Sequence, residues 1–201
     1  NYSINQDLRD KKFRTEDGYV TTFTQELPII SDNSEISNAF EVTKFKKLST
    51  TSKMVGKVSF FGKTVTGLSD DVRISKRLNI PSSRLRGFQS GKVGPIENND
   101  YIGGNHLSSL NLSATLPNVV EGLDNLDVGV FIDAANLWGI DYDSSIDDKS
   151  TIRTSTGVAL NLLTPIGPLS FSFANALSKA SSDKTETFRF NLGLSLIHIS
   201  E

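Results

Sequence analysis

The stretch that decides the fold is residues 107–116, LSSLNLSATL. Leucine or alanine stands at every second position from Leu110 to Leu116, and asparagine, serine or threonine stands between them. A strict period of two gives a strand one apolar face and one polar face. The stretch therefore predicts a β-strand, and the same alternation recurs on both sides of it.

Other stretches show this alternation, which makes about eight strands in series. They are residues 19–27, 37–46, 53–64, 127–135, 152–163, 169–174 and 188–193. Their polar faces carry mostly Ser, Asn, Thr, Gly and Ala, whereas the polar face of a soluble β-sandwich usually carries many Lys and Glu. Small polar residues suit a crowded, hydrated lumen. We therefore predict an all-β fold and favour an antiparallel transmembrane β-barrel, with a soluble sandwich as the alternative.

Composition narrows the functional classes. The chain has 201 residues, a net charge of -2 and a pI near 5.8, so no basic surface for nucleic acid is expected. It has no cysteine, which excludes disulfides, thiolate nucleophiles and zinc–cysteine clusters. No apolar run reaches the roughly 20 residues of a membrane-spanning helix, but alternating strands contain no such run, so a membrane barrel remains possible.

A long insert, residues 66–104, separates the third and fourth strands. Loops of this length are usually functional or disordered. This one carries a cation, a glycine and an aromatic in succession within RLRGF at 84–88, followed by GKVGP at 91–95. We therefore expect a shaped and packed loop.

No set of nucleophile, base and orienting group that could support catalysis is recognisable, so we predict that the chain is not an enzyme and binds no cofactor. The acidic stretch 141–148 has Ile146 where a calcium loop needs its glycine, and Ile152 where the loop needs its bidentate glutamate. His106 has no metal-binding partner at a useful spacing. We expect a solvated acidic loop and no metal site.

A series of short motifs occurs along the chain: LRGF at 85–88, GP at 94–95, IGGN at 102–105, VFIDAANLW at 130–138, IRTSTGVAL at 152–160, TPIGPL at 164–169 and FRFNLG at 188–193. In this order and spacing they resemble the BamA-like outer-membrane barrels, which share a superfamily with two-partner secretion transporters. The resemblance implies a sixteen-stranded barrel, of which residues 1–193 are the C-terminal half, with the long loop folded into the lumen. Residues 194–201, LSLIHISE, match the translation of a DNA-library adapter, and we expect them to be a non-native tail.

The resemblance also implies a site. In such barrels the arginine of the long loop meets an acid of the inner wall; carried over, Arg86 is that cation and Asp133 its partner. The alternation independently places Asp133 on the polar face. Gly87 would allow a tight turn, and Phe88 would anchor the loop by apolar burial. Asn111 stands where relatives can carry a second acid and is a possible second partner. We call Arg86, Gly87, Phe88 and Asp133 the lumen-loop lock.

The implied function is the insertion and assembly of client β-barrel proteins in the bacterial outer membrane. The last strand would meet the first strand of the barrel at a weak seam, with Phe188, Phe190, Leu192 and Gly193 as seam residues. The implied partners are the outer-membrane lipid bilayer, client β-barrels and accessory lipoproteins, with no nucleic acid. Two alternatives stay open: a polypeptide-secreting pore of the same superfamily, and a passive structural barrel.

Overall fold

The structure is a computed structural model that describes residues 1–12, 14–28, 35–49, 51, 53–117, 119, 125–164 and 167–192. In these residues the chain forms a nine-stranded sheet in the order β1-β2-β3-β4-β7-β8-β9-β10-β11 and a two-stranded sheet, β5-β6. The elements are β1 (Tyr2–Asp7), β2 (Gly18–Glu26), β3 (Glu35–Lys47), β4 (Val55–Gly67), the 3-10 helix η1 (Ile74–Lys76), β5 (Ile96–Glu97), β6 (Asp100–Tyr101), β7 (His106–Pro117), β8 (Leu126–Trp138), β9 (Arg153–Thr164), β10 (Gly167–Ser178) and β11 (Phe188–Leu192). No helix in the described part of the chain is long and apolar enough to cross a membrane. All neighbouring strands are antiparallel, which confirms the predicted fold class.

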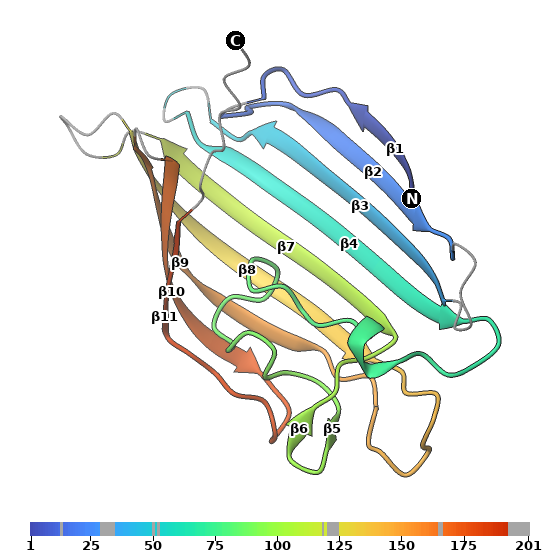
Figure 1. The fold of residues 1–201 in the computed structure, drawn as a ribbon. Helices are drawn as coiled ribbons and strands as arrows, with labels where there is room; N and C mark the ends of the chain where they lie inside the picture. Colours follow the sequence, from blue (N-terminus) through green and yellow to red (C-terminus); the bar gives the residue numbers. More distant parts are fainter. Residues whose placement is uncertain are drawn as a thin grey trace.

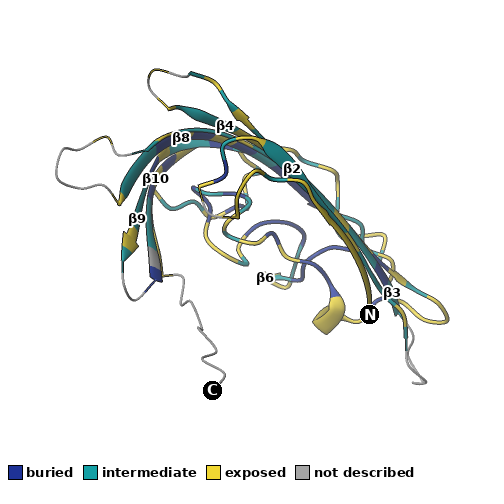
Figure 2. Cartoon of the chain, turned by 90° about the horizontal axis from the view of Figure 1, so that it is seen from above, coloured by how far each residue is buried: buried dark blue, intermediate teal, exposed yellow. Residues whose placement is uncertain are grey.

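The large sheet curves into an arch, and the insert lies on its concave side (Figures 1 and 2). The strands follow one another in chain order except that β4 pairs directly with β7. The insert, residues 68–105, therefore leaves the sheet at one strand end and returns at the neighbouring one, with η1, β5 and β6 inside it. This path brings the insert against the inner faces of β7 and β8.

Strand β1 extends the sheet beyond the strands that the alternation predicts. It pairs with β2 from Tyr2 opposite Gln25 to Asp7 opposite Val20. Only Tyr2 and Ile4 are apolar in this segment, so its period of two is too weak to recognise. The segment is a strand because its backbone forms hydrogen bonds with β2, and not because of its own side-chain pattern.

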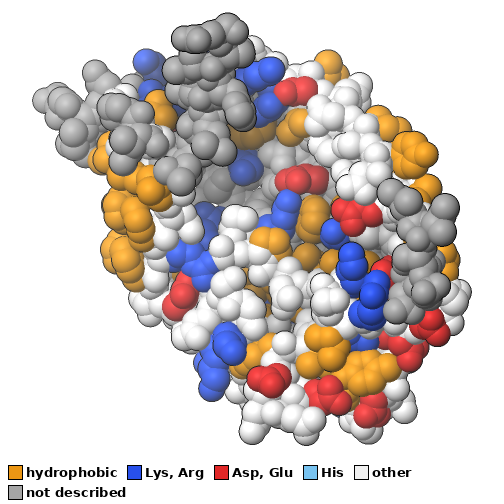
Figure 3. Space-filling model, in the orientation of Figure 1, with side chains coloured by type: hydrophobic (Ala, Val, Ile, Leu, Met, Phe, Trp, Pro, Cys, Tyr) orange, Lys and Arg blue, Asp and Glu red, His pale blue; other side chains and the backbone are white. Residues whose placement is uncertain are grey.

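The convex face of the sheet is apolar. Side chains of neighbouring strands lie opposite one another in rows, such as Val58, Leu112 and Ile132, and Ile132 is still 51% exposed. Seen from the concave side, hydrophobic side chains gather along the rims of the arch, and charged ones lie within it (Figure 3). A continuous apolar surface of this kind indicates a face that is covered by a non-aqueous environment.

The buried core lies between the concave face and the insert. Its main cluster combines insert residues with residues of β7 and β8: Leu78, Ile80, Leu85, Phe88, Val93, Leu107, Ala135 and Leu137. Elsewhere the concave face is polar, and Ser59, Asn111, Asp133 and Ser155 form one row across four strands. The fold thus packs a structured loop against a polar inner wall.

Candidate functional site

The arginine of the insert and the acid of the inner wall form a bidentate ion pair. Arg86 Nε lies 2.7 Å from Asp133 Oδ2, and Arg86 Nη2 lies 2.7 Å from Oδ1. The backbone N–H of Arg86 donates to the same carboxylate at 3.2 Å. The Asp133 side chain is fully buried, and the guanidinium lies 3.4 Å from the centroid of the Phe131 ring. A charge-assisted, two-point contact fixes both the position and the orientation of the insert.

Asn111 completes this group. Its side-chain amide donates to Asp133 Oδ1 and to the carbonyl of Arg84, both at 2.8 Å. An acid at this position would add a second negative charge for Arg86 to neutralise. The amide adds a donor instead, so the buried carboxylate is satisfied by one cation and one neutral side chain.

Gly87 and Phe88, which follow Arg86 in the sequence, determine the path and the packing of the insert there. Gly87 has a φ of +87°, a conformation that strains residues with a Cβ, and a Cβ added there would lie 3.1 Å from the Cβ of Ala174. The Phe88 side chain is 1% exposed and belongs to the apolar cluster. The structure therefore brings together the predicted lock residues and Asn111.

The predicted seam residues lie on the last described strand. Phe188 faces the convex side opposite Phe173, with ring centroids 5.0 Å apart. Phe190 and Leu192 lie on the same face of β11, and Gly193 lies outside the described residues. Among the strands that the structure describes, β11 pairs with β10 alone.

A second ion pair, which sequence reasoning missed, ties the start of the insert to the β8–β9 loop. The Arg77 side chain is fully buried, and its Nη2 lies 2.7 Å from Asp141 Oδ1. Val72 N–H donates to Oδ2 at 2.9 Å. Burial acts to raise the pKa of Asp141, but the hydrogen bonds from Val72 and Asn105 and the charge of Arg77 hold that pKa below its ordinary value. The acidic loop is therefore not simply solvated at Asp141.

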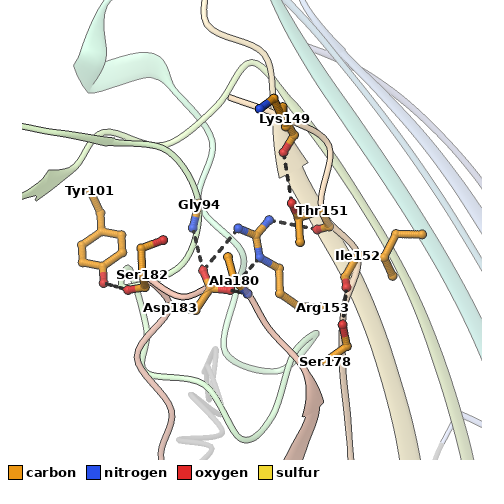
Figure 4. Close-up of polar contacts among 10 residues, drawn as sticks. All are labelled: Gly94, Tyr101, Lys149, Thr151, Ile152, Arg153, Ser178, Ala180, Ser182 and Asp183. Carbon is orange, nitrogen blue, oxygen red and sulfur yellow. Dashed lines mark hydrogen bonds and ion pairs between the residues drawn. The ribbon is translucent and has the colours of Figure 1, made fainter. Parts of the chain in front are cut away.

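A third ion pair, also missed, links β9 to the β10–β11 loop. Arg153 Nε lies 2.9 Å from Asp183 Oδ2, and Nη2 lies 3.2 Å from Oδ1. Both side chains are buried, at 4% and 0% exposure. Figure 4 shows that Gly94 of the insert directs its N–H at the same carboxylate. The alternation places Arg153 on the polar face, but no local pattern pairs it with an acid 30 positions away.

A polar cavity of about 340 Å³ adjoins the Arg86–Asp133 pair. Charged and amide side chains contribute to its lining, among them Glu41, Lys57, Arg84, Arg86, Asn111 and Asn161. A cavity of this size and polarity can hold water. Within the described residues, no group of three or more His, Cys, Asp or Glu side chains could hold a metal ion. The arrangement is suited to holding a loop in a wet interior.

An apolar convex face, a polar inner wall and an insert seated against that wall define a segment of a transmembrane β-barrel. Residues 1–196 match the family model described as the Omp85 superfamily domain. The chain belongs to the Omp85 superfamily.

Curated relatives and a solved structure refine this assignment. The chain is 31% identical over 138 residues to the outer membrane protein assembly factor BamA of Neisseria meningitidis serogroup B, a match that covers 54% of this chain and 17% of that protein. It is 27% identical over 113 residues to the protein of the same name from Neorickettsia risticii, covering 55% of this chain and 15% of that one. The crystal structure of BamA from Haemophilus ducreyi lacking POTRA domains 1–3 has the same fold, with a TM-score of 0.83 at 23% identity over 94% of this chain and 40% of that chain.

These matches confirm the resemblance to a BamA-like barrel segment, and the location is the bacterial outer membrane. The matched part is less than a fifth of the length of either curated relative.

Replacing Ile132 by arginine tests the lipid-facing assignment. Ile132 stands at the middle of β8 on the convex face, where a buried arginine is expected to cost about 2–4 kcal/mol of stability. The control is Asn161→Arg, which places the same side chain on the lumen side, opposite Asp127. Denaturant unfolding of the complete protein in phospholipid vesicles measures both. Equal losses for the two variants would contradict a lipid-facing convex surface.

Proposed function

We propose that the protein inserts and assembles client β-barrel proteins in the bacterial outer membrane, without a cofactor or nucleotide. The observation that carries the proposal is the buried Arg86–Asp133 pair in a chain whose curated relatives are named outer membrane protein assembly factors. A carboxylate buried in the inner wall needs a partner, and the guanidinium of the insert provides one. The lumen-loop lock would thus hold the insert in a fixed position, and this position would fix the shape of the lumen.

The last strand would form the seam at which a client enters. In the described part of the chain, strand β11 pairs with β10 along one edge, from Phe188 opposite Phe173 to Leu192 opposite Leu169. Its other edge would meet the first strand of the complete barrel. When that seam opens, the unpaired N–H and C=O groups can pair with an incoming strand of the client. Strand pairing and burial of the client's apolar face in lipid would drive insertion.

The partners follow from this mechanism. Clients would be proteins whose strands alternate in the same way and can extend the sheet at the edge of β11. The lipid bilayer would cover the convex face. Accessory lipoproteins would be further partners, as the resemblance to BamA-like barrels implies.

A reconstitution experiment tests the proposal. The complete protein is placed in vesicles of phosphatidylethanolamine and phosphatidylglycerol, and an unfolded eight-stranded outer-membrane barrel is added. Folded client is detected by its faster migration on an unheated gel. We expect wild-type vesicles to accelerate client folding and Arg86→Ala vesicles to do so far less.

Two other results would favour the competing functions. A client that crosses the vesicle membrane and is recovered unfolded inside indicates a secretion pore. A wild-type protein that is itself folded but leaves client folding at the rate of empty vesicles indicates a passive barrel.

A further inference from the structure

The segment that precedes β11 is paired along its backbone with the insert. Glu186 N–H donates to the carbonyl of Gly87 at 3.0 Å, and Gln89 N–H donates to the carbonyl of Lys184 at 2.9 Å. Between these bonds an antiparallel bridge is centred on Phe88. The Arg-Gly-Phe segment of the insert thus has a strand-like neighbour on the β10–β11 loop.

Asp183 is the junction of this contact. Its buried carboxylate accepts from Arg153 of β9, from Gly94 of the insert at 3.4 Å and from Ala180 of its own loop at 2.6 Å (Figure 4). Arg153 also donates to the carbonyl of Thr151 at 3.0 Å. One charge therefore joins three segments of the chain, and without Arg153 that charge would be buried and uncompensated.

The contact continues into β11 itself. Arg189 of β11 donates from Nη2 to the carbonyl of Phe88 at 2.9 Å. Tyr101 of β6 donates from its hydroxyl to the carbonyl of Ser182 at 2.5 Å. The insert therefore contacts residues 182–186 of the loop before β11 and also touches β11 directly.

We propose that Arg153 and Asp183 are a positioning pair that holds the β10–β11 loop against the insert, so that the seat of the insert sets the position of β11. The inference rests on the proposed function, because it makes β11 the strand whose position matters. A shift of the insert, which the lumen-loop lock holds, would then also shift the seam strand β11. A change at Asp183 acts on the seam through the insert and touches no client.

The test is an Asp183→Asn substitution in the complete protein, reconstituted in the same vesicles. The amide is nearly isosteric with the carboxylate but removes the charge that Arg153 requires. Client folding is expected to slow by about tenfold, within the range for a residue that couples two sites. Amide exchange in the peptide that contains Lys184 and Glu186 should quicken by on the order of a hundredfold. Asp147→Asn is the control, since its side chain is 75% exposed.

An engineered disulfide distinguishes a positioning role of the pair from a general contribution to stability. Gln89 and Lys184 are exposed and lie opposite one another, and paired residues of antiparallel strands have Cα atoms about 5.5 Å apart, within disulfide range. This chain has no cysteine, and any cysteine elsewhere in the complete protein is replaced by serine. Gln89→Cys with Lys184→Cys should restore client folding to the Asp183→Asn protein when oxidised, and a reductant should remove the rescue.

Two results would overturn the inference: client folding by Asp183→Asn that equals the Asp147→Asn control, or a disulfide that forms without rescue. If Asp183→Asn does not fold, Arg153→Lys, which keeps the charge but loses the two-point contact, is measured against the same criteria. Wild-type protein that fails to fold the client would overturn the proposed function alone, because amide exchange still reports on the pair.

Discussion

Replacing Asp133 by alanine is expected to lower the stability of the barrel by about 3–5 kcal/mol and to abolish client assembly. The change leaves the guanidinium of Arg86 and the amide of Asn111 without their common acceptor at the inner wall. The Arg86 side chain is 20% exposed beside a polar cavity, so water recovers part of the loss and we expect the lower end of the range. Denaturant unfolding of the complete protein in vesicles gives the stability, and the client-folding assay gives the activity.

Two further variants make this prediction specific. Asp147→Ala removes an acid from an exposed loop position and should change neither quantity. The double exchange Arg86→Asp with Asp133→Arg should restore only part of the loss, because the Asn111 amide would then direct its donor at a cation. Stability of Asp133→Ala equal to that of Asp147→Ala would show that the pair does not hold the insert.

The strands and their faces could be predicted because the signal for them is local. The alternation in residues 107–116 and 127–135 places Asn111 and Asp133 on the same kind of face without any knowledge of pairing. The register then brings these two residues opposite one another. The contact with Arg86 needed the resemblance, since the path of a long loop leaves no periodic trace in the sequence.

Two further anchors of the insert could not be predicted for the same reason. Arg77 and Arg153 each pair with an acid of a loop, 64 and 30 positions away respectively. Loop conformations depend on turns and tertiary contacts that no hydrophobic period records. A buried arginine on a predicted inner face, such as Arg153, does imply that an acid must lie nearby. Such an acid can lie in a neighbouring loop, and Asp183 lies in the loop between β10 and β11.

Replacing Phe88 by alanine is expected to cost about 3–5 kcal/mol, the range for a buried phenylalanine. Its ring is 1% exposed in the cluster that joins the insert to Leu107 and Leu137. Phe88→Leu keeps most of the volume and should cost less than about 1.5 kcal/mol. The control is Phe60→Ala, because that ring lies on the convex face of β4 opposite Leu110 and is 41% exposed within the protein.

Limited trypsin digestion in vesicles separates a loosened insert from a loosened barrel. Arg84 and Arg86 are the cleavage sites next to the ring, and both are held by ion pairs in the packed insert. In Phe88→Ala these sites should be cut while the strands remain resistant, since the lost contacts belong to the insert. The ion pair alone would then be too weak to seat the loop, and apolar burial would be the larger part of the lock. If the insert of Phe88→Ala stays resistant, the Arg86–Asp133 pair is sufficient, and the ring contributes only to packing.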